Sequence, residues 1–153
     1  MKKLLIALTL GACGFSPMYT ETRTAETAQI FIAPISGTNG IDLRNELIAR
    51  FNTDNVESAA KYMLSVDLKK PAVSYKALQI SGDATWQEIR LTAAYTLKSG
   101  DAVVASGTAS AAESYTFVRD LVSANAARTN AEQNVISVLA GDIASRINAK
   151  LGG

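Results

Sequence analysis

The stretch "TWQEIRLTAAYTLK" (residues 85–98) alternates between apolar and mainly polar side chains over its whole length. A period of two residues predicts a β-strand with one buried and one exposed face. The predicted buried face consists of Ile89, Leu91, Ala93, Tyr95 and Leu97. The opposite face consists of Trp86, Glu88, Arg90, Thr92, Thr96 and Lys98.

The segments on both sides of this stretch predict strands that pair with it. "KSGD" (residues 98–101) is typical of a hairpin turn, and residues 103–117 return as a strand of Ala, Ser, Gly and Thr. Upstream, residues 61–69 alternate as well, and the phase of the alternation flips after Pro71. Proline within a strand pattern indicates an edge or a bulge.

Two segments have helical spacing, and together with a first strand they predict the fold. Residues 42–52 repeat Leu43, Leu47 and Phe51 at every fourth position, and residues 125–151 show the same spacing from Ala131 to Leu151. The connection that contains the first helix is long enough for a crossover, which would make residues 29–33 parallel to the next strand. We therefore expect one α+β domain over residues 29–153. It would be a two-layer α/β sandwich in which both helices cover one face of a four-stranded mixed sheet, in the order β-α-β-β-β-α.

The first residues indicate a secretory signal. Two lysines precede an apolar run that is too short to span a bilayer. The run ends in Leu10-Gly11-Ala12-Cys13, which resembles the bacterial lipobox. We expect residues 1–12 to be a lipoprotein signal peptide and residues 13–28 to be a lipidated N-terminus and tether. Acyl chains on Cys13 would anchor the chain, since each buried methylene contributes about 0.8 kcal/mol. A buried N-terminal helix with an incidental cysteine would leave the lysines and the order of small residues unexplained.

Composition argues against several other classes of protein. A formal net charge of +1 gives no sign of nucleic-acid binding. The chain has no histidine and one cysteine, so an internal disulfide is excluded and the usual zinc ligand sets are missing. Gly37 and Gly40 lack the lysine of a phosphate loop. We expect no enzyme, no metal and no cofactor beyond the acyl chains.

The face opposite the helices is the candidate surface for a partner. Trp86, Glu88, Arg90 and Thr92 would lie there, and tryptophan is enriched where protein surfaces are buried against each other. Alternatively, the Trp86 side chain folds over the sheet edge or packs on the tether. The pattern alone does not decide between these two arrangements.

Several stretches in order resemble the LPS-assembly lipoproteins of the LptE type, most closely the α-proteobacterial branch. They are "CGFSPMY", "IFIAPISGTNGIDLRNEL", "IRLTAAYTL", "SYTFV" and "AEQNVISVLAGDIASRINAKL". The resemblance implies a lipoprotein at the periplasmic side of the outer membrane. Such a lipoprotein plugs the lumen of the large β-barrel of the LPS translocon and supports its assembly and LPS transport.

The same resemblance implies contacts between LPS phosphates and basic side chains. The candidates are Lys69, Lys70, Lys76, Arg90 and Lys98, which could equally be an ordinary solvated surface. An alternative function for the whole chain is a periplasm-facing lipoprotein module that binds peptidoglycan or a small ligand.

Overall fold

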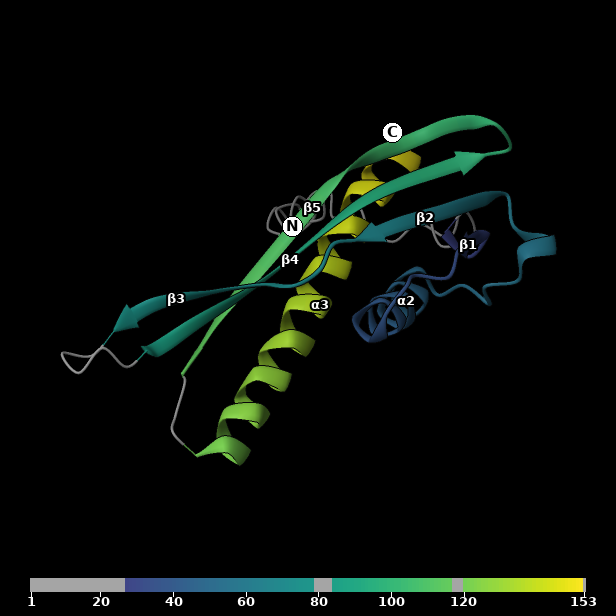
Figure 1. Ribbon diagram of the computed structural model, residues 1–153. Coiled ribbons are helices and arrows are strands. Elements are labelled where there is room, and N and C mark those ends of the chain that lie inside the picture. Colours follow the sequence, from purple (N-terminus) through teal and green to yellow (C-terminus); the bar gives the residue numbers. More distant parts are fainter. Residues whose placement is uncertain (1–26, 79–83, 117–119, 153) are drawn as a thin grey trace, which may run out of the picture.

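The computed structural model describes residues 27–78, 84–116 and 120–152 (Figure 1). The elements are β1 (Ile30–Ile32), α2 (Thr38–Phe51), a 3-10 turn (Glu57–Ala59), β2 (Tyr62–Leu68), β3 (Ala72–Leu78), β4 (Ala84–Ser99), β5 (Ala102–Thr116) and α3 (Leu121–Leu151). Two helices and one mixed sheet form an α+β arrangement, as the sequence predicts. The signal peptide, Cys13 and most of the tether lie outside the described residues.

The sheet has the predicted pairing with one more strand than expected. β1 pairs in parallel with β2, and β4 pairs antiparallel with both β2 and β5. β3 pairs with the other half of β4, on the same side as β2. The sheet therefore has five strands where the sequence predicts four.

The extra strand arises where Pro71 interrupts the predicted strand. Leu68 pairs with Ala93 and Ala72 pairs with Arg90, so residues 69–71 lie opposite residues 91–92. One additional residue on this side reverses the alternation, because successive side chains of a strand point to opposite faces. As a result Val66 and Val73 both lie on the helix side of the sheet, although one position is even and the other odd.

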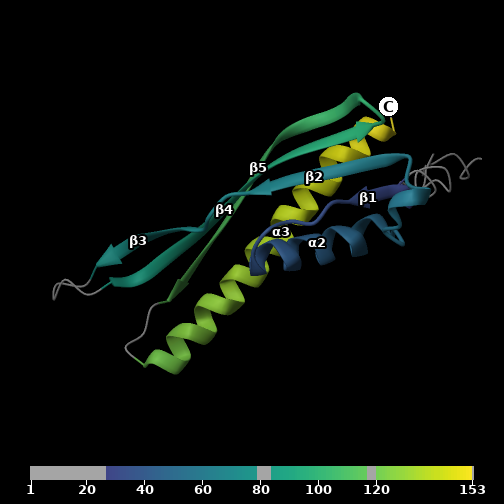
Figure 2. The ribbon, with the colours of Figure 1, turned by 45° about the vertical axis from the view of Figure 1, so that its right-hand side comes forward.

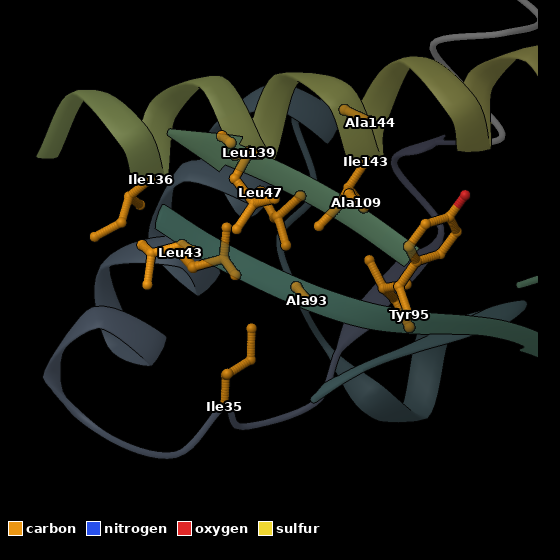
Figure 3. Packing of buried hydrophobic residues seen from close by; sticks show 14 of the residues in the cluster. Ile35, Leu43, Leu47, Ala93, Tyr95, Ala109, Ile136, Leu139, Ile143 and Ala144 are labelled. Atoms are coloured by element: carbon orange, nitrogen blue, oxygen red, sulfur yellow. The ribbon is translucent and has the colours of Figure 1, made fainter. Parts of the chain in front are cut away.

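Both helices lie on the same side of the sheet, as Figures 1 and 2 show from two directions. Leu43 and Leu47 of α2, Leu139 and Ile143 of α3, and the predicted face of β4 form one buried cluster. In Figure 3 the small side chains Ala93 and Ala109 lie beneath α3. Small residues on β5 thus leave room for a helix to pack closely on the sheet.

The two helices begin four residues earlier than their patterns indicate. α2 begins at Thr38, inside the "GTNG" segment that turn chemistry assigns to a loop. A Cβ on Gly40 would lie 2.7 Å from the carbonyl oxygen of Ile35, so only glycine fits in this first turn. α3 begins at Leu121, and the Asp120 side chain caps it by accepting a hydrogen bond from the Ser123 amide at 2.9 Å.

Side chains form hydrogen bonds with the backbone groups at the outer edge of β1. The Asn55 side-chain oxygen accepts the Ile32 amide at 2.6 Å, and Arg44 donates to the Ile32 carbonyl at 3.0 Å. The Thr53 hydroxyl lies 2.8 Å from the Ile30 carbonyl. These bonds occupy the positions that another strand would need.

Within the described residues, neither helix combines the length and apolarity that a bilayer crossing requires.

Candidate interaction surface

The side of the sheet opposite the helices is not covered by any described element, and we call it the open face. Met63, Ser65 and Asp67 of β2 are exposed there, as the alternation of residues 61–69 predicts. β4 contributes the predicted polar set, and β5 adds a row of small side chains: Ser106, Thr108, Ser110, Ala112, Ser114 and Thr116. The open face is therefore mostly polar.

Trp86 lies on this face near the end of β4 that pairs with β3. It is opposite Thr116 of β5 in the register, and 47% of its surface is exposed. A half-exposed tryptophan on a mostly polar surface is typical of residues that contact a partner protein. Its role in binding a partner stays a prediction.

Glu88 joins two of the predicted basic residues. Its carboxylate lies 3.2 Å from the Lys76 ammonium and 3.0 Å from the Arg90 guanidinium. The Lys76 hydrogen bond, with a further contribution from Arg90, lowers the pKa of Glu88 below its ordinary value. Two cations around one carboxylate leave this cluster with a net positive charge, which suits an anionic group.

The other basic candidates do not join this cluster. Lys69 forms an ion pair with Asp67 at the break between β2 and β3. Lys70, in the same break, and Lys98, beside the β4–β5 turn, are exposed and form no ion pair with the described residues. The ion pairs of Glu88 thus join Lys76 and Arg90 only.

The hydroxyl row of β5 is a feature that the sequence reasoning did not place on the candidate surface. The Thr92 and Ser110 hydroxyl oxygens lie 3.2 Å apart across the open face. The signal was present as Ser or Thr at most even positions between 106 and 116, alternating with buried Ala and Tyr at several odd positions. Because all these side chains except Tyr115 are small, the alternation has little contrast in hydropathy and is easily missed.

A second missed feature is an apolar surface at the far end of the molecule. Val73 and Tyr75 of β3 lie on the helix side of the sheet yet are 43% and 69% exposed. Leu121 and Val122, in the first turn of α3, are also exposed. The alternation after Pro71 places Val73 and Tyr75 on a common face, but it contains no information about what covers that face.

The lipid-attachment residue Cys13 and the cleavage-site residues Leu10, Gly11 and Ala12 lie outside the described residues, so their roles stay predictions.

Comparison with known proteins defines the class of fold. No family model and no curated protein sequence matches the chain. Solved structures of bacterial proteins described as lipoproteins do match over most of its length. The chain has the fold of this group.

Three of these structures illustrate the likeness. A candidate lipoprotein from Caulobacter crescentus is 18% identical, with a TM-score of 0.70, and the match covers 86% of this chain and 97% of that one. The rare lipoprotein B from Shewanella oneidensis is 12% identical, with a TM-score of 0.64 and coverage of 80% and 96%. A minor lipoprotein from Acinetobacter baumannii is 18% identical, with a TM-score of 0.59 and coverage of 81% and 93%.

Proposed function

We propose that this protein is an outer-membrane lipoprotein, anchored on the periplasmic side through Cys13. It plugs and helps to assemble the β-barrel of the LPS translocon, and so supports LPS transport to the outer leaflet. It acts by binding and not by catalysis. The sequence resemblance to LPS-assembly lipoproteins and the fold shared with bacterial lipoproteins support this proposal.

The observation that carries the proposal is the uncovered, polar side of the sheet. The lumen of a large outer-membrane barrel is polar, whereas its lipid-facing exterior is apolar. A plug must therefore present polar side chains outward over its own apolar core. The hydroxyl row of β5 and the Lys76–Glu88–Arg90 cluster meet this requirement on one continuous surface.

The basic side chains offer sites for LPS in the same proposal. Lys76 and Arg90, held together by Glu88, are the strongest pair for a lipid phosphate. Lys69, Lys70 and Lys98 would add weaker contacts along β4.

Co-purification from membranes in mild detergent tests the plug. The tagged full chain is expected to bring down one large β-barrel protein in a fixed ratio. Recovery of peptidoglycan fragments or a small ligand, with no barrel protein, would instead support the alternative of a ligand-binding module.

The variant Trp86→Glu sharpens this test. It is expected to weaken recovery of the barrel while leaving the melting temperature nearly unchanged, because Trp86 is half exposed. A lowered melting temperature with unchanged recovery would assign Trp86 to the packing of the domain.

The anchor is tested separately. Cys13→Ser should leave an uncleaved precursor that takes up no labelled palmitate. Labelling of the Cys13→Ser protein would contradict the lipobox interpretation.

A further inference from the structure

The three outer edges of the sheet differ in how they are protected. Side chains of Arg44, Thr53 and Asn55 occupy the edge of β1. The edge of β3 is short, follows Lys69-Lys70-Pro71 and contains register shifts. Lysines, proline and bulges are the usual means by which natural proteins prevent an edge from pairing with another strand.

Over residues 105–116, β5 has none of these protections, and its one register shift lies near its start, between Val103 and Ala105. The strand runs for 15 residues without proline or lysine, and its one charged side chain, Glu113, accepts a hydrogen bond from Asn134. Within the described residues, no hydrogen bond involves the backbone N–H or C=O groups along its outer edge. A long, unguarded edge of this kind is a template for an added strand.

One hydrogen bond fixes which backbone groups point outward. The Thr92 carbonyl accepts the Lys69 amide at 2.9 Å, so the backbone of Thr92 points toward β2 and β3, away from β5. In an antiparallel pair both backbone groups of a residue point the same way, and the direction alternates along the strand. Ser110, the partner of Thr92, therefore points its N–H and C=O away from β4.

The same alternation applies to the rest of β5 beyond the register shift at Leu97. The outward groups belong to Ser106, Thr108, Ser110, Ala112, Ser114 and Thr116. The short distance between the Thr92 and Ser110 hydroxyls agrees with this assignment, because side chains approach most closely in pairs that are not hydrogen bonded.

We propose that the outer edge of β5 binds an extended segment of the barrel partner, which adds to the sheet as a further strand; this rests on the proposed function. The wall of a closed barrel has no free strand edge, so the segment must come from a loop in the lumen or from chain outside the wall. The small hydroxyl side chains beside the edge, and the absence of a free charge on β5, fit an uncharged segment with small side chains.

Hydrogen exchange resolved by residue, on the free full chain and on its complex with the barrel, tests this inference. In the free chain the amides of Thr108, Ser110 and Ala112 should exchange fast, and those of Ala109 and Ala111 slowly. In the complex the first set should slow by at least about tenfold and the second should change little. A stable complex in which the even-numbered amides stay fast would overturn the added strand and leave the plug intact, whereas failure to form a complex would count against the plug itself.

Protection of the even-numbered amides in the free chain, through its own tether or a second copy, would also overturn the inference.

Proline substitution gives an independent test with matched controls. Ser110→Pro removes an outward N–H and should weaken recovery of the barrel at least about tenfold, since proline is tolerated on the solvent side of an edge strand. Ser110→Ala keeps the N–H and should bind as the original chain does. Ala109→Pro removes an N–H that bonds to β4 and should lower the melting temperature. If Ser110→Pro itself fails to fold, the hydrogen-exchange measurement still tests whether a strand is added to β5.

Discussion

β2 and β3 pair with the same strand, β4, but their helix-side residues have opposite environments. On β2, Tyr62 is 8% exposed and Leu64 is fully buried. On β3, the helix-side residues Val73 and Tyr75 are 43% and 69% exposed. Both strands alternate in sequence, so the difference does not come from the strands themselves.

The difference comes from what lies beneath each strand. α2 has only 14 residues, about 21 Å of helix, and lies on the side of β1 and β2 (Figures 1 and 2). α3 extends further and covers the helix side of β4 and β5, where Gln87, Ile89 and Tyr115 are buried. Nothing in the described part of the chain lies beneath β3. An alternating strand therefore buries its apolar side chains only where a helix covers them.

Replacing one tyrosine in each strand should show the largest contrast. Tyr62→Ala is expected to lower the free energy of unfolding by about 3 kcal/mol, because it leaves a cavity beneath β2. Tyr75→Ala is expected to change it by no more than about 0.5 kcal/mol, since the side chain is mostly in water. Urea unfolding of both variants measures the two effects. Equal losses would mean that β3 is covered in solution by part of the chain outside the described residues.

Glycine substitutions test how tightly the protein is packed where β4 pairs with β2. A Cβ on Gly107 would lie 2.9 Å from the Tyr95 hydroxyl, whereas one on Gly141 would meet only the Arg50 guanidinium at 3.6 Å. Gly107→Ala should cost about 1–3 kcal/mol through overpacking, and Tyr95→Phe in the same chain should recover part of that loss. Gly141→Ala should stabilise α3 by about 0.5–1 kcal/mol. Thermal unfolding of the single and double variants checks both signs, and a neutral Gly107→Ala would show that Tyr95 moves freely.

The smallest effect on stability is expected at Glu88, which lies where β4 pairs with β3. Its pKa is lowered from 4.5 in the folded chain, chiefly by Lys76, so its ion pairs stabilise the fold above that pH and are lost as the pH falls below it. Glu88→Gln should therefore lower the urea midpoint slightly near pH 7, and this difference should shrink as the pH falls through the lowered pKa of Glu88. A difference that does not shrink as the pH falls would point to packing and not to charge.

The fold class could be predicted because its main elements have unambiguous periods. The alternation of β4 and the four-residue spacing of Leu139, Ile143 and Ile147 each allow one assignment only. The parallel pairing of β1 with β2 followed from the length of the crossover, and the structure confirms it.

The rest depends on contacts that a local pattern does not contain. Gly40 looks like a turn residue, and only its contact with Ile35 shows why it lies inside α2. The early start of α3 had a local signal in Asp120, a good N-cap residue that the helical spacing of the apolar residues does not reveal. For the candidate surface, alternation identified which face is polar. The ion pairs of Glu88 and the free edge of β5 depend on which strands become neighbours.

The extra residue between β2 and β3 has a consequence for tolerated changes of length. Adding or removing two residues at Lys69-Lys70-Pro71 would keep every later side chain of β3 on its present side of the sheet. Adding or removing one would send Tyr75 to the side of Trp86 and Lys76 to the side of α3. At this connection the chain can therefore vary in even steps, and an odd step would exchange the two sides of β3.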